Sequence, residues 1–175
     1  MGEVRIERVT PQHVSTIEDG LAELLAESVA QGAAVSFILP FGRAEALAFW
    51  RDKVFPDVAA GTRVLMAATS DGAVLGTVNM DIALPPNQPH RCDVAKMIVH
   101  PEARRQGIAT GLMQALENEA RALGKTLMTL DTRTGDKAER LYAKLGFVRA
   151  GVVPGFALDP DGKSLHATTY MYKKI

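Results

Sequence analysis

The chain has a single cysteine, Cys92, among its 175 residues. It therefore cannot form an internal disulfide, and it cannot build a cysteine metal cluster. Its four histidines, His13, His90, His100 and His166, are scattered and show none of the spacings typical of metal ligands. We therefore expect no metal site.

Neither an excess of one charge nor a long apolar run is present. The 20 Lys and Arg residues balance the 20 Asp and Glu residues. Nucleic-acid-binding domains usually carry a basic excess, so nucleic acid is not an expected partner. No apolar run approaches the roughly 18 residues that span a membrane, and residues 1–10 lack the apolar core of a secretory signal. We expect a cytoplasmic protein with no membrane partner.

The remaining composition is ordinary for a globular protein, with 47% hydrophobic and 23% charged residues. The length suits one domain covering residues 1–175. Thr10 is the expected N-cap of a long amphipathic helix, and Ser70-Asp71-Gly72 is the expected turn of a hairpin. Strands are predicted at 3–9, on both sides of that turn within 62–84, at 92–100, 126–131, 147–153 and 166–174, helices at 10–32, 44–54, 108–123 and 136–146, and loops at 33–42, 85–90 and 154–165.

One turn carries chemistry that this mixed α/β order alone does not explain. The segment "HPEARRQGIATGLMQALENEA", residues 100–120, places arginines and a glycine at the start of a helix. The first N–H groups of a helix have no intrahelical partner, and the helix dipole adds positive charge, so an anion is favoured there. Gly107 lets a ligand approach the backbone, and Arg104 and Arg105 add charge. A solvated basic loop that only caps the helix is the alternative.

Two motifs together resemble one family. "MIVHPEARRQGIATGLMQALE" followed by "AERLYAKLGFVRAG", within residues 97–151, is similar to the GNAT superfamily of acetyl-CoA-dependent N-acetyltransferases. The family pattern Arg/Gln-x-x-Gly-x-Gly/Ala matches residues 104–109. The resemblance implies a central mixed, mostly antiparallel sheet with flanking helices, and acetyl-CoA as co-substrate. The cofactor-binding residues that it implies are Met97, Ile98, Val99, Arg104, Arg105, Gln106, Gly107, Ile108, Ala109 and Thr110.

One position departs from that family, and several segments are similar to one of its subgroups. Many members have an Asn that contacts pantetheine where this chain has Gly135, so that contact is not carried over. The segments at 20–37, 91–99, 130–142 and 154–168 resemble the tabtoxin-resistance acetyltransferases, which acetylate an amino-acid-like β-lactam toxin. That resemblance implies a small amine acceptor and a role in toxin or antibiotic resistance.

Three residues are candidates for the chemistry. Acetyl transfer needs a deprotonated amine, donors for the carbonyl oxygen and a proton for the leaving thiolate. Tyr142 stands at the tyrosine position of the family and is the candidate acid, although it also completes the apolar stripe of its helix. The resemblance matches Asp93 and Asp131 to acidic active-site positions, for deprotonation or for holding the ammonium. The alternative for Asp93 is an exposed strand position without a catalytic role, and the alternative for Asp131 is a turn residue at the end of a strand.

Cys92 invites an acyl-cysteine mechanism, but no histidine stands at an interpretable position to activate it, so direct transfer is favoured. A peptide or protein acetyltransferase and a non-catalytic acyl-CoA sensor remain the alternatives to a small-molecule enzyme. A peptide acceptor needs an open groove, and the loops at 33–42 and 85–90 are expected to cover the acceptor side instead. The sequence leaves the oligomeric state open, a homodimer included.

Overall fold

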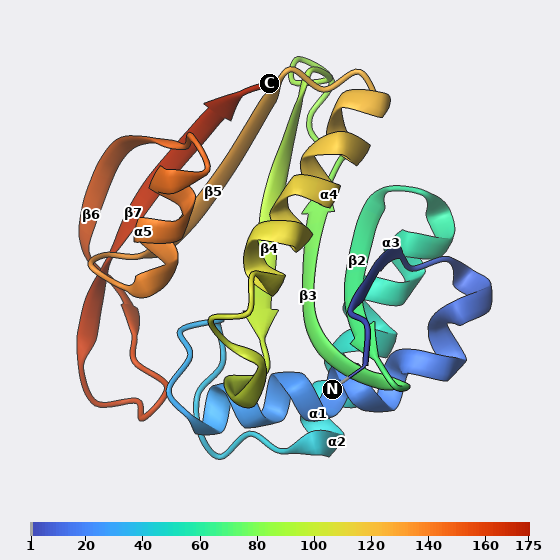
Figure 1. Ribbon diagram of the computed structural model, residues 1–175. Coiled ribbons are helices and arrows are strands. Elements are labelled where there is room, and N and C mark those ends of the chain that lie inside the picture. Colours follow the sequence, from blue (N-terminus) through green and yellow to red (C-terminus); the bar gives the residue numbers. More distant parts are fainter. Residues whose placement is uncertain (1) are drawn as a thin grey trace.

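The computed structural model describes residues 2–175, which contain a seven-stranded sheet in the order β1-β2-β3-β4-β5-β7-β6 (Figure 1). Neighbouring strands are antiparallel, except that β4 and β5 run parallel. This confirms the predicted mixed, mostly antiparallel sheet. The strands are β1 (Arg5–Arg8), β2 (Arg63–Ser70), β3 (Ala73–Asp81), β4 (Arg91–Val99), β5 (Leu127–Arg133), β6 (Val148–Leu158) and β7 (Leu165–Lys174).

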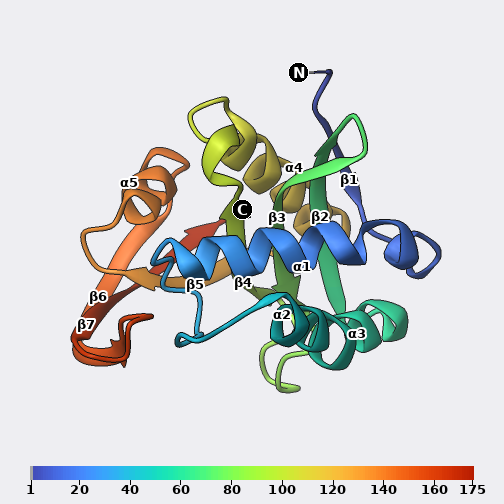
Figure 2. The same cartoon turned by 90° about the horizontal axis from the view of Figure 1, so that it is seen from below.

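Helices cover both faces of the sheet (Figure 2). α1 (Val14–Ala30), α2 (Arg43–Phe49) and α3 (Phe55–Ala60) lie on one face, and α4 (Ile108–Ala122) and α5 (Lys137–Lys144) lie on the other. Each face therefore has its own apolar core. Leu21, Leu25 and Trp50 are fully buried in the first, and Leu112 and Leu116 in the second. No helix within residues 2–175 combines the length and the apolar character that crossing a membrane requires.

The first long helix begins later than its sequence pattern predicts. Residues Pro11–His13 form a 3-10 turn closed by the N–H of His13 donating to the Thr10 carbonyl at 2.9 Å, and α1 begins at Val14. The Thr10 side chain makes no capping hydrogen bond. Short 3-10 turns are common at helix starts, and Pro11 suits one because it has no N–H to satisfy.

The second helical region is longer than the predicted 44–54. α2 passes into a π-helical turn at Trp50–Val54, and α3 continues to Ala60. The wider turn lets the N–H of Phe55 donate to the Trp50 carbonyl just before Pro56, where an α-helical bond would be lost. Burial of Phe55 and Val58 in the core keeps the chain helical beyond the proline.

The last hairpin is also longer than predicted, since β6 extends to Leu158 and β7 begins at Leu165. The predicted loop at 154–165 includes Pro154 and Gly155. The register of β6 against β7 breaks between Val153 and Ala157, which accommodates both residues. β6 is an edge strand, and an edge strand tolerates a proline because its outer N–H needs no partner.

Candidate active site

The sheet opens between its two parallel strands. β4 pairs with β5 only from Arg91 to Asp93, opposite Leu127 to Thr129. Beyond this point the strands diverge, as Figure 1 shows, while β4 stays paired with β3 as far as Val99. The edge of β4 that would face β5 therefore borders a cavity of about 630 Å³, lined by residues 94–99 of β4 and 131–133 of β5.

A β-bulge lies in β4 where it borders this cavity. Thr77 of β3 pairs with Ile98 and Asn79 pairs with Ala95, so two β4 residues, Lys96 and Met97, oppose a single residue of β3. Lys96 has a φ of 53°, in the left-handed region that non-glycine residues rarely adopt. A bulge of this kind redirects side chains and often lies beside a functional site.

The start of α4 forms the other side of the cavity. Gly107 has a φ of 82° and precedes the first residue of the helix, Ile108. The first backbone hydrogen bond into the helix is donated by Gly111 to Gly107, so within residues 2–175 the N–H groups of Ile108–Thr110 have no backbone acceptor. These groups and the helix dipole favour an anion. All the predicted cofactor-binding residues line the cavity except Gln106, whose Nε2 donates to the Glu102 carbonyl at 3.3 Å.

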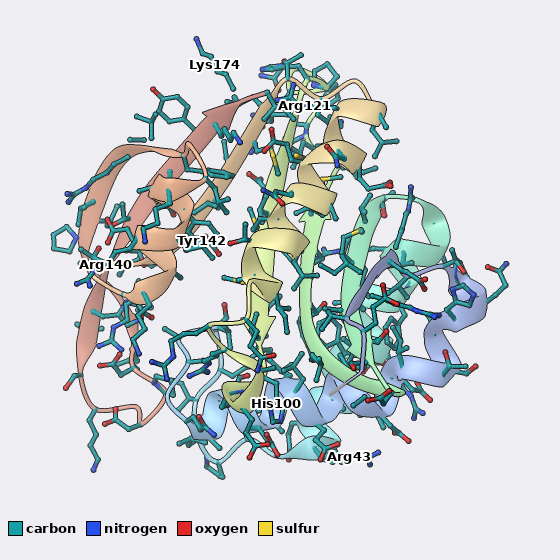
Figure 3. All side chains as sticks on the ribbon, in the orientation of Figure 1. Arg43, His100, Arg121, Arg140, Tyr142 and Lys174 are labelled. Atoms are coloured by element: carbon teal, nitrogen blue, oxygen red, sulfur yellow. The ribbon has the colours of Figure 1, made fainter. Side chains whose placement is uncertain are left out.

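Tyr142 extends from α5 into the same cavity and lies in the gap between α5 and β4 (Figure 3). It is only 6% exposed, and its ring lies 5.8 Å from that of Phe147. Burial raises the pKa of Tyr142 above its usual value, and the nearby carboxylates of Asp131 and Asp136 raise it further. The hydroxyl therefore keeps its proton at neutral pH.

The two predicted aspartates have different surroundings. Asp131, near the end of β5, is exposed and lines the cavity with Tyr142. Asp93 lies where β4 and β5 are still paired, and its carboxylate accepts hydrogen bonds from the Arg91 guanidinium and the Thr129 hydroxyl. Asp93 does not line the cavity. The structure thus brings Asp131 and Tyr142 together and leaves Asp93 outside.

Cys92 is fully buried in the core beneath α4, and its Sγ lies 3.9 Å from the Leu127 carbonyl oxygen. Burial raises the pKa of the Cys92 thiol to about 11, so the nucleophilic thiolate is scarce at neutral pH. Both facts agree with the prediction that Cys92 is not a nucleophile.

We expect Cys92→Ala to retain near-normal kcat with acetyl-CoA, because a buried thiol plays no part in direct transfer. Steady-state turnover of the variant and the wild-type enzyme gives the comparison. Mass-spectrometric trapping of an acetylated Cys92 that proceeds to product would contradict this expectation.

The loop at 33–42, which the sequence predicts on the acceptor side, lines the cavity with residues 33–36, whereas the loop at 85–90 does not line it. The end of α1 and the segment that follows contribute Ser28 and residues 31–36, and β4 contributes Lys96. Of these residues, sequence reasoning missed Ser28, residues 31–32 and Lys96. The signal at Lys96 was a charge within the otherwise apolar run "VAKMIV", residues 94–99.

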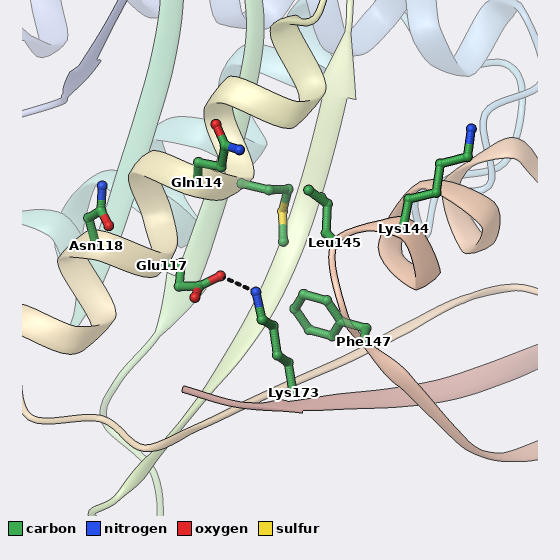
Figure 4. A pocket seen from close by; sticks show the side chains of 8 residues that line it. Gln114, Glu117, Asn118, Lys144, Leu145, Phe147 and Lys173 are labelled. Atoms are coloured by element: carbon green, nitrogen blue, oxygen red, sulfur yellow. Dashed lines mark hydrogen bonds and ion pairs between the residues drawn. The ribbon is translucent and has the colours of Figure 1, made fainter.

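A second hollow, of about 350 Å³, lies between α4 and the loop after α5 (Figure 4). Its main polar feature is an ion pair of 2.5 Å between Glu117 and Lys173. None of the predicted site residues lines it, and its two central charges already neutralise each other. Across residues 2–175, no group of three or more His, Cys, Asp and Glu side chains could hold a metal ion.

Comparison with known proteins agrees with this geometry. The family model "Acetyltransferase (GNAT) family" matches residues 28–147. A curated relative, an uncharacterized N-acetyltransferase in the hisH-hisA intergenic region of Azospirillum brasilense, is 28% identical over 136 residues, which are 76% of this chain and 77% of the relative.

Two solved structures share the fold. An N-acetyltransferase from Staphylococcus aureus Mu50 superposes with a TM-score of 0.78 at 19% identity and covers 99% of each chain. YncA of Salmonella typhimurium, in a structure with its cofactor acetyl-CoA, superposes with a TM-score of 0.76 at 18% identity, over 99% of this chain and 94% of YncA. The chain belongs to the Acetyltransferase (GNAT) family and is an acetyl-CoA-dependent N-acetyltransferase.

Proposed function

We propose that residues 1–175 form one domain that transfers acetyl directly from acetyl-CoA to the primary amine of a small, amino-acid-like acceptor. The observation that carries this proposal is the single cavity bordered by the start of α4, the free edge of β4, Tyr142 and Asp131. The anion-binding start of α4 and two groups that can donate or accept a proton, Tyr142 and Asp131, thus line the same cavity. A toxin of the tabtoxinine-β-lactam type is one acceptor of this kind.

The residues at the start of α4 fit the phosphates of acetyl-CoA. The unpartnered N–H groups of Ile108–Thr110 and the helix dipole favour a pyrophosphate, and Arg104 and Arg105 add positive charge at the cavity wall. Bound acetyl-CoA supplies an activated thioester. The backbone of Met97–Val99 is free on its β5 side to donate hydrogen bonds to the carbonyl oxygen, where negative charge grows during transfer.

We assign the departing thiolate's proton to Tyr142. A tyrosine hydroxyl is already protonated at pH 7, and burial and two carboxylates raise the pKa of Tyr142 further, so the hydroxyl carries a proton to donate as the carbon–sulfur bond breaks. Tyr142 is the buried residue of α5, and its ring packs in the core beside Phe147.

We assign the binding and deprotonation of the acceptor amine to Asp131. The amine must lose one proton before its nitrogen bonds to the acetyl carbon, because an ammonium has no lone pair. The Asp131 carboxylate can hold the ammonium and pass that proton to solvent, since the residue is exposed and borders the cavity. A carboxylate is a much weaker base than an amine, so a water relay suits this step better than direct abstraction. Asp93 is assigned neither the binding nor the deprotonation of the amine, because it does not line the cavity.

The acceptor side favours a small molecule over a peptide. Residues 31–36 line the cavity, and the same loop is tied down where the N–H of Leu39 donates to the Pro160 carbonyl at 2.7 Å. The loop thereby covers the face from which an acceptor would approach. A peptide acceptor would need an open groove on that face.

The test is coenzyme A release from acetyl-CoA across a panel of free amino acids, polyamines, tabtoxinine-like amino acids and short peptides. We expect turnover with at least one small amine, with peptides slower by at least about tenfold because the covered face excludes their second residue. Faster turnover with peptides would favour the peptide alternative. Binding of acetyl-CoA without turnover on any amine would favour the sensor alternative.

A further inference from the structure

Lys96 lies on the acceptor side of the cavity, away from α4. Its ammonium lies 5.3 Å from the centre of the Phe37 ring and 5.6 Å from that of Phe49, and its Nζ is 3.2 Å from the Ser36 Oγ. Phe37 and Phe49 pack into the core on the α1–α2 face, whereas α4 lies on the opposite face. The β-bulge therefore directs this lysine away from the phosphate-binding end.

The ammonium of Lys96 has no carboxylate partner. Within residues 2–175 it makes no ion pair, whereas the two nearby arginines do: Arg63 pairs with Asp57 at 3.0 Å and Arg133 pairs with Asp159 at 2.9 Å. An ammonium has three N–H donors, and Ser36 takes only one of them. Two donors are therefore left for a ligand.

Burial without a counter-ion is costly for a charged group. Burial lowers the pKa of Lys96, and the carboxylate of Asp131 opposes this shift. Asp131 is thus close enough to act on Lys96 electrostatically, yet it forms no direct ion pair with it. Lys96 and Asp131 therefore offer the cavity a cation and an anion that form no ion pair within residues 2–175.

We propose that Lys96 binds a carboxylate of the acceptor while Asp131 holds its ammonium, so that the enzyme selects amines that also carry a carboxylate. This inference rests on the proposed function and names the chemical class of its acceptor. The two rings beneath Lys96 confine the ammonium to the cavity side, which orients the acceptor before its nitrogen reaches the acetyl carbon.

The test compares each accepted L-amino acid with its own carboxamide, which keeps the amine and the shape but loses the negative charge. We expect the wild-type enzyme to favour the acid by about 10- to 100-fold in kcat/KM, the range of a hydrogen bond to a charged group. In Lys96→Met, which keeps the length of the side chain, this ratio should fall to near one. Lys96→Arg should keep part of it.

Lys137→Met is the matched control, because Lys137 also borders the cavity but lies at the start of α5. Its acid-to-amide ratio should equal that of the wild-type enzyme. A purely structural role for Lys96 would lower both rates by one factor and leave the ratio unchanged, which would overturn this inference alone. A wild-type enzyme that binds acetyl-CoA yet acetylates no amine would overturn the proposed function as well.

Discussion

Replacing Tyr142 with Phe is expected to lower kcat by about 10²- to 10⁴-fold, the usual contribution of a general acid. This corresponds to roughly 3 to 5 kcal/mol of barrier at about 1.4 kcal/mol per tenfold. Phenylalanine keeps the ring that packs beside Phe147, so the fold and the affinity for acetyl-CoA should change little. Only the proton for the leaving thiolate is lost.

The measurement is kcat for both proteins, with acetyl-CoA affinity determined separately. The loss should be smaller for an acyl donor with a more acidic leaving thiol, since that thiolate needs less help to depart. Tyr172→Phe is the matched control: it removes a hydroxyl from β7 at a residue that does not line the cavity, and it should be nearly silent. Equal kcat values for Tyr142→Phe and wild type would leave Tyr142 a core residue only.

Replacing Gly107 with Glu is expected to abolish stabilisation of the protein by acetyl-CoA. A ligand that binds only the folded state adds about 2.7 kcal/mol at a hundred times its dissociation constant. A glutamate at Gly107 would place a negative charge beside the N–H groups of Ile108–Thr110, where the pyrophosphate is proposed to bind. Thermal unfolding with and without acetyl-CoA measures the difference.

The substitution also strains the backbone, because a side chain at a positive φ costs roughly 1–2 kcal/mol. Gly124→Glu controls for that strain. Gly124 has a φ of 71°, has nothing within 4 Å of an added Cβ, and follows the opposite end of α4. Both variants should lose stability without ligand, but only Gly107→Glu should lose the ligand-induced shift. An equal shift in Gly107→Glu and wild type would rule out a phosphate site at this turn.

Local patterns were enough to predict the start of α4 and the position of α5. The order of arginine, glycine and apolar residues from Arg104 to Ile108 predicts a basic turn and a helix, and both are present. α5 runs from Lys137 to Lys144, within the predicted 136–146. Such elements depend on capping, periodicity and turn residues a few positions apart, so a single sequence contains the information. The roles of the site residues stay predictions.

Contacts between distant segments decided the rest. Helical structure continues past Pro56 because Phe55 and Val58 reach a core shared with α1. Asp93 and Asp131 both lie in predicted strands, yet only Asp131 lines the cavity, because β4 and β5 pair at Asp93 and separate before Asp131. The direction of the Lys96 side chain is set by the β-bulge of β4 against β3. Strand separation and register are set by partners that lie far away along the chain, and alternation within one strand cannot encode them.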